Sequence, residues 1–93
     1  MRDAVLCDRA SVAEIMSTIK ELDPVALTSG LPAHGLKRED VGTAVLVHQN
    51  GAAFEVEFVG YGGNTVALVT LEREQVRPLQ AGDIPHVREL AAA

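Results

Sequence analysis

The clearest alternation of hydrophobic and polar residues in this chain lies beside an Asn-Gly pair. Residues 53–59 read Ala-Phe-Glu-Val-Glu-Phe-Val, a period of two that is typical of a strand with one buried and one solvated face. The preceding arm, residues 43–48, contains three β-branched residues. Asn50 and Gly51 lie between the arms, and both accept positive φ, which makes this dipeptide a strong hairpin signal. The pattern therefore predicts a β-hairpin at the centre of the domain.

Shorter runs of strand-forming residues surround this hairpin. We expect strands at residues 25–28, 65–71 and 75–78, separated by turn-forming segments rich in glycine and proline. Five short strands with tight later turns predict a mainly β fold. The expected architecture is a small SH3-like, five-stranded, bent antiparallel barrel.

A different spacing marks the N-terminal segment. Ser11 followed by Glu14 fits a capping box, after which apolar residues recur every three or four positions until Asp23 precedes a proline. We therefore expect an added N-terminal α-helix that covers the outward side of the barrel or packs on a second copy of the chain. The side chains expected at this contact are Val12, Ile15, Met16, Ile19 and Leu46.

These elements divide the chain into three parts. Residues 1–23 form the N-terminal arm and helix, residues 24–79 form the barrel, and residues 80–93 form a C-terminal tail that makes a short helix or frays. No internal repeat is visible.

Two of the expected strands are apolar on both faces, which a barrel alone does not require. In the strand at 43–47 we expect Val45 and Val47 to fill the barrel while Ala44 and Leu46 face outward. The outward residues need a cover, and the amphipathic N-terminal segment is the nearest candidate.

Composition narrows the classes of function. The chain has 93 residues, 47% of them hydrophobic, and a formal net charge of −5. Nucleic-acid-binding proteins rely on clustered Lys and Arg, and here Lys37-Arg38 is followed at once by Glu39-Asp40, so we expect no nucleic-acid partner. The uncharged apolar runs are too short to span a membrane, no N-terminal signal core is present, and Cys7 is the single cysteine. We therefore expect a cytoplasmic protein without a membrane partner.

Several motifs, in a specific order and spacing, add a family resemblance. They are Leu31-Pro32-x-His34-Gly35-Leu36, Asp40-Val41-Gly42-Thr43, Phe54-Glu55-Val56-Glu57-Phe58-Val59, Thr65-x-Ala67-Leu68-x-Thr70-Leu71 and Gln75-Val76-Arg77-Pro78. Over about residues 22–79 the chain resembles the small bacterial family named domain of unknown function 4926. The resemblance implies an SH3-like barrel with no assigned enzyme activity. It also implies a protein partner of the kind found in paired toxin–antitoxin or immunity genes. Family members usually carry glycine where this chain has Glu39, which implies a differently bent loop tip here.

Three titratable residues are candidates for chemistry. Glu55 and Glu57 share a strand face, with carboxylates roughly 6 to 7 Å apart, a spacing that suits acid–base catalysis or a hard cation. A solvated acidic face that blocks edge pairing is the simpler explanation. His34 lies in a Pro/Gly-defined loop, where it fixes the turn or contacts a ligand or pH-sensitive partner. The histidines lack the spacing of a zinc site, so we expect no metal and no other cofactor.

The leading hypothesis is a non-enzymatic protein-interaction module, with homodimerisation left open. The residues expected to contact a partner are His34, Lys37, Arg38, Glu55, Glu57 and Tyr61. One alternative is a ligand- or metal-binding protein or small enzyme that uses Glu55, Glu57 and His34. A third is an RNA-binding SH3-like barrel, which the acidic charge disfavours.

Overall fold

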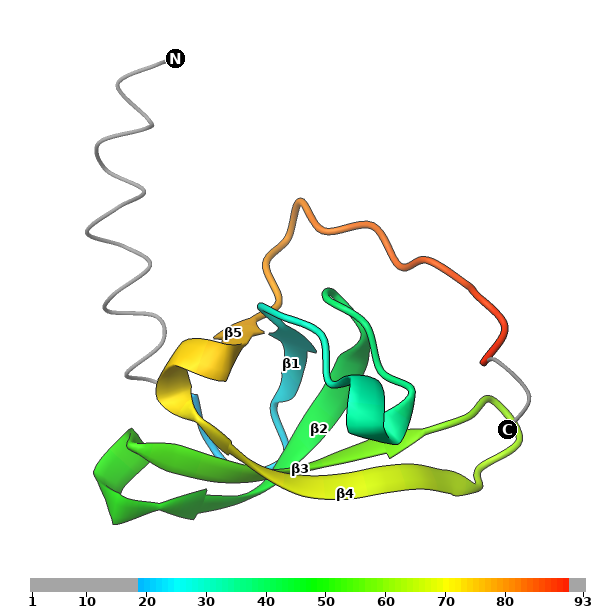
Figure 1. The fold of residues 1–93 in the computed structure, drawn as a ribbon. Coiled ribbons are helices and arrows are strands. Elements are labelled where there is room, and N and C mark those ends of the chain that lie inside the picture. Colours follow the sequence, from blue (N-terminus) through cyan, green and yellow to red (C-terminus); the bar gives the residue numbers. More distant parts are fainter. Residues whose placement is uncertain (1–18, 91–93) are drawn as a thin grey trace.

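The computed structural model of the chain describes residues 19–90, which form one five-stranded antiparallel sheet (Figure 1). The strands are β1 (Pro24–Leu27), β2 (Val41–His48), β3 (Ala53–Val59), β4 (Thr65–Glu72) and β5 (Val76–Pro78). Three short 3-10 helices connect them, namely η1 (Pro32–His34), η2 (Gln49–Gly51) and η3 (Arg73–Gln75). The expected mainly β fold with five antiparallel strands is confirmed. Within the described residues, no helix has the length and apolar character needed to cross a bilayer.

The predicted central hairpin is confirmed. Strands β2 and β3 pair antiparallel, from Thr43 opposite Glu57 to His48 opposite Ala53. The connection needs positive φ at Asn50 (56°) and Gly51 (96°), and the preceding Gln49 also adopts a φ of 51°. Asn and Gly accept this left-handed conformation at low cost, which explains why the local sequence was sufficient to predict the turn.

The predicted closure of the sheet into a barrel is wrong. The strand order is β4-β3-β2-β1-β5, and within the described residues the two outer strands β4 and β5 do not pair with each other. Strand β5 has only three residues, and they pair with β1, which makes β5 an edge strand of the sheet. Bulges after Ala44 and Phe58 bend the sheet without closing it.

One of these bulges also changes which side chains of β2 face the core. Ala44 is buried (0% exposed) rather than outward-facing as expected, because the register shifts between Ala44 and Leu46. An extra residue in one strand moves the following side chains to the opposite face. Val47 packs against the core and Leu46 remains 43% exposed, both in agreement with the expectation.

The core lies on one side of the sheet and is mostly aliphatic. Strand β3 contributes Phe54, Val56 and Phe58, all buried as their alternation predicts. Strand β1, which lies between β2 and β5, contributes Val25 and Leu27 to the same core. The other members of this cluster are Ile19, Leu36, Ala44, Ala67, Leu71 and Val76.

The expected N-terminal helix falls mostly outside the described residues, as do Val12, Ile15 and Met16. The described end of that segment, residues 19–23, is a turn rather than a helix, with φ of 73° at Leu22. Its backbone joins β2 instead, since Ala44 N donates to Asp23 O at 2.9 Å. Ile19 is only 6% exposed and belongs to the core.

The described part of the C-terminal tail, residues 79–90, contains no helix, whereas the sequence left open a short helix or a frayed end. After a turn at residues 81–82 the chain runs extended from β5 past β1 toward the β3–β4 turn (Figure 1). Pro85 and the earlier Gly82 give this segment little helix propensity, and its one internal backbone hydrogen bond joins Asp83 N to Gln80 O.

Candidate functional site

Two hollows lie beside the tail, where it passes the loop between β1 and β2. The larger, of about 680 Å³, is bordered by the loop residues 37–41, by Arg77 and by tail residues 82–86 and Arg88. The smaller, of about 270 Å³, lies between tail residues 86–88, Leu90 and the β3–β4 turn. Asp40, Val41, His86 and Arg88 border both hollows. We use the name tail groove for the surface of the β1–β2 loop, the sheet and the β3–β4 turn along which the tail and the two hollows lie.

At the larger hollow, the floor of the tail groove is the face of the sheet opposite the core. Ala26 of β1 pairs with Val41 of β2 and with Arg77 of β5, and residues paired across antiparallel strands share a face. Ala26 is 1% exposed yet lies outside the core cluster. Strand β1 is therefore buried on both sides, by the core on one side and beneath the tail groove on the other.

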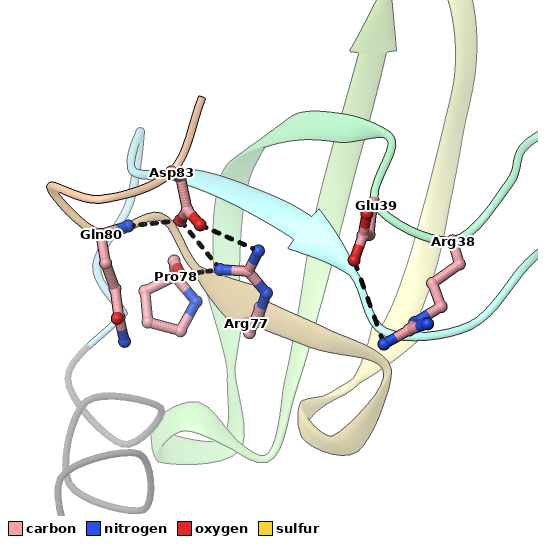
Figure 2. A network of polar contacts seen from close by, with 6 residues as sticks. All are labelled: Arg38, Glu39, Arg77, Pro78, Gln80 and Asp83. Atoms are coloured by element: carbon pink, nitrogen blue, oxygen red, sulfur yellow. Dashed lines mark hydrogen bonds and ion pairs between the residues drawn. The ribbon is translucent and has the colours of Figure 1, made fainter. Parts of the chain in front are cut away.

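A first ion pair holds the tail close to its attachment at β5. Arg77 Nη1 donates to Asp83 Oδ2 at 2.9 Å, and Arg77 Nη2 donates to Asp83 Oδ1 at 3.3 Å (Figure 2). Gln80 N donates to the same carboxylate at 2.7 Å. The Arg77 hydrogen bond, followed by that of Gln80, lowers the pKa of Asp83. This bidentate pair sets the direction in which the tail leaves the sheet.

A second ion pair holds the far end of the tail to the β1–β2 loop. Arg88 Nε donates to Asp40 Oδ1 at 2.9 Å, and Arg88 Nη2 donates to Asp40 Oδ2 and to Gly35 O, the latter at 3.1 Å. The side chains of Arg88 and Asp40 are only 26% and 19% exposed, so solvent screens this pair less than a surface pair. The Arg88 hydrogen bond lowers the pKa of Asp40, while burial acts in the opposite direction.

The rest of the tail has weak attachments. Within the described residues, the backbone of 84–90 makes no hydrogen bond to the backbone of the sheet. Ile84, Val87 and Leu90 are 87%, 91% and 47% exposed. The tail is therefore held chiefly by two arginine–carboxylate pairs, and few apolar contacts oppose its release.

Three of the six predicted partner-contact residues border the tail groove. Lys37 and Arg38 lie at the larger hollow, and the fully exposed Tyr61 lies at the smaller one. Arg38 pairs with Glu39 at 4.0 Å, but these side chains are 72% and 62% exposed, so the pair contributes little to stability (Figure 2).

The other three predicted contact residues lie elsewhere. His34 is exposed in η1 and does not border either hollow. Glu55 and Glu57 lie on β3 in alternation with its three buried residues, together with the exposed Leu46 opposite Glu55. The structure therefore does not bring the six residues together at one site.

The two strand glutamates are occupied by cross-strand hydrogen bonds. Glu55 accepts from Thr70 Oγ1 at 2.7 Å and lies 3.2 Å from His48 Nε2, while Glu57 accepts from Thr65 Oγ1 at 2.7 Å. The Thr70 hydrogen bond, followed by that of His48, lowers the pKa of Glu55, which favours a stable carboxylate acceptor over a proton donor. Among residues 19–90, no group of three His, Cys, Asp or Glu side chains is placed to hold a metal ion.

Reasoning from the sequence missed most of the polar residues of the tail groove, namely Asp40, Arg77, Asp83, His86 and Arg88. The sequence around Asp40 indicated a polar site, because this residue is the last of a charged loop tip. The sequence around Arg88 gave no such indication, because its partner is 48 residues away along the chain. Only the path of the tail across the sheet brings them together.

Comparison with known proteins gives one match, which lies within the described part of the chain. A family model described as Domain of unknown function (DUF4926) matches residues 21–78. No curated protein and no solved structure matches the chain. The family match includes all five strands and ends at Pro78, before the tail.

Proposed function

Since this chain belongs to the Domain of unknown function (DUF4926) family, we propose that it acts as a non-enzymatic module that binds a protein partner. The proposed binding surface is the tail groove, which takes an extended segment of that partner.

One observation carries this proposal: an extended segment already lies in the groove and is held there by side chains. The carboxylate of Asp40 accepts hydrogen bonds from two nitrogens of the Arg88 guanidinium, and both hollows border this contact. Recognition of extended peptides commonly combines a few such polar anchors with neighbouring apolar surface. The groove offers both kinds of contact.

The residues we assign to partner contact are Lys37, Arg38 and Tyr61, which border the groove. All three are exposed, and long cations and tyrosine are side chains that contribute strongly at protein interfaces. His34 lies on the same loop and can extend the interface, whereas Glu55 and Glu57 belong to the other end of the exposed sheet face.

The wider setting is part of the same proposal. We propose that the chain is a cytoplasmic bacterial protein and that its bent sheet is related to SH3-like folds. We also propose that it works as the antitoxin- or immunity-type component of a small gene pair. The metal-binding, catalytic and RNA-binding alternatives stay predictions, and no contact in the described part of the chain favours them over peptide binding.

Affinity capture with matched variants tests the proposal. Full-length chain would be used to capture proteins from its native host, in parallel with the double variant Lys37→Ala/Tyr61→Ala. Arg73→Ala is the control, since Arg73 is exposed on η3 and borders neither hollow. We expect a partner retained by the wild-type and Arg73→Ala chains and reduced about tenfold by the double variant.

Light scattering on the pure protein completes this test. If every captured protein is retained equally by all three chains, the assignment of the tail groove as the partner site is wrong. If the pure wild-type chain is a dimer that the double variant dissociates, the partner is a second copy.

A further inference from the structure

We propose that residues 83–90 are an intramolecular ligand of the tail groove, and that the partner displaces them with an extended segment carrying arginine followed two positions later by an aliphatic residue. This inference rests on the proposed function and names the chemistry of the partner. It also makes the tail a built-in competitor for the partner's site.

The acceptor for the arginine is shaped by the loop without help from the tail. Lys37 N donates to Asp40 Oδ2 at 2.8 Å, and Asp40 N donates to Lys37 O at 3.0 Å. These two contacts fix the carboxylate within its own turn. A carboxylate that is already oriented loses less conformational entropy when it binds a guanidinium.

The groove distinguishes arginine from lysine by geometry. Arg88 uses Nε and Nη2 on the two oxygens of Asp40, and Nη2 also donates to Gly35 O. A planar guanidinium satisfies three acceptors in this arrangement, whereas an ammonium cannot place its donors in the same fork. The partner segment should therefore carry arginine at this position.

The position two residues further along meets apolar surface. A Cβ placed on Gly35 would lie 3.7 Å from Leu90 Cδ1, so Leu90 packs beside the backbone of Gly35. Leu36, Phe58 and Val66 border the same smaller hollow. In an extended chain, residues two apart point to the same side, so one segment presents arginine and an aliphatic side chain together.

The tail suits the role of a competitor because it is tethered and weakly held. The Arg77–Asp83 pair keeps the start of the tail at the sheet, and only four residues separate Asp83 from Arg88. A short tether gives the tail an effective concentration in the millimolar range, so a partner needs higher affinity than a free copy of the tail. The exposed Ile84 and Val87 leave few contacts to break on release.

Peptide binding to full-length variants tests the inference. The probe is a labelled synthetic peptide with the sequence of residues 83–90, Asp-Ile-Pro-His-Val-Arg-Glu-Leu. Arg88→Glu places a carboxylate beside Asp40 and releases the tail of the full-length chain. Fluorescence anisotropy should show that the Arg88→Glu chain binds the peptide at least about tenfold more tightly than the wild-type chain.

Three matched controls identify the contacts. A peptide with alanine in place of its arginine, and a chain carrying both Arg88→Glu and Asp40→Asn, should each lose about tenfold or more in affinity. A peptide with alanine in place of its valine should bind unchanged, because Val87 is 91% exposed in the bound tail. A random-peptide library selected on the Arg88→Glu chain should enrich arginine followed two positions later by Leu, Ile or Val.

Several results would overturn the inference. Equal affinity of the peptide for wild-type and Arg88→Glu chains, both shown by circular dichroism to be folded, would mean that the tail does not compete. A library selection without the arginine–aliphatic pattern, or a wild-type dimer formed by exchanged tails, would remove the assigned partner chemistry. If any of these results occurs while capture of a partner still depends on Lys37 and Tyr61, the proposed partner binding at the tail groove stands. Only the competition by the tail and the arginine–aliphatic partner chemistry are then wrong.

Discussion

Gly42 shows at the scale of one residue how closely β2 approaches β3. A Cβ placed there would lie 2.8 Å from Val56 Cγ1 and 2.9 Å from both Glu57 O and Phe58 Cδ2. Two of these atoms belong to buried side chains and one to the backbone, so none can move away easily. The role of this glycine in the structure is to leave space between the two strands.

Gly42→Ala should therefore lower the free energy of unfolding by about 1–3 kcal/mol, the usual cost of overpacking a core. Urea denaturation gives this value directly. The control is Gly60→Ala, because no atom lies within 4 Å of the Cβ position there, and its effect should stay below about 0.5 kcal/mol. Equal effects of the two substitutions would contradict the close approach of the strands.

Glu39 shows how tertiary contacts can override a local preference. The family resemblance implied a differently bent loop tip at this position, which stays a prediction, and Glu39 adopts a positive φ of 75°. Glu39 N donates to Leu27 O at 2.8 Å, and the following Asp40 is held in a turn with Lys37. These contacts hold the loop in shape although a non-glycine residue disfavours the left-handed region.

At the scale of elements, the attachment of the tail to the sheet and to the β1–β2 loop depends on two ionised carboxylates. Arginine hydrogen bonds lower the pKa of both Asp40 and Asp83 below their ordinary values. A carboxyl with a lower pKa in the folded than in the unfolded state contributes its full stabilisation above its unfolded pKa, about 3.9. That contribution is lost as the pH falls through the lowered folded value.

The tail should therefore stay attached at neutral pH and detach below about pH 4, before or together with acid unfolding of the sheet. Nuclear magnetic resonance can follow this through the signals of His86 and Val87, with Phe54 as a reporter of the core. In Asp40→Asn the far end of the tail should already be detached at pH 7. A tail that stays attached in this variant would show that the Asp40–Arg88 pair does not hold it.

At the scale of the whole molecule, stability should depend on one face of the sheet. Phe54 is 0% exposed in the core, whereas Leu68 on neighbouring β4 is 59% exposed. Phe54→Ala should cost about 3–5 kcal/mol of unfolding free energy, and Leu68→Ala no more than about 0.5 kcal/mol.

Chemical denaturation of both variants checks this difference. A chain of this size has a total stability of only about 5–15 kcal/mol, so Phe54→Ala can unfold it. Val56→Ala, which removes fewer atoms from a fully buried side chain, then provides a milder comparison. A large loss of stability in Leu68→Ala would mean that the opposite face of the sheet is also packed.

Local patterns in the sequence determined the strands of this protein, its central hairpin and its buried β3 residues. Alternation with a period of two and the conformational tolerance of Asn50 and Gly51 act over neighbouring residues, so a single stretch of chain contains the whole signal. Only the tertiary structure decided the bulge after Ala44, the open sheet and the path of the tail. Those features depend on contacts between distant segments, and no local pattern records that Arg88 meets Asp40 across 48 residues of chain.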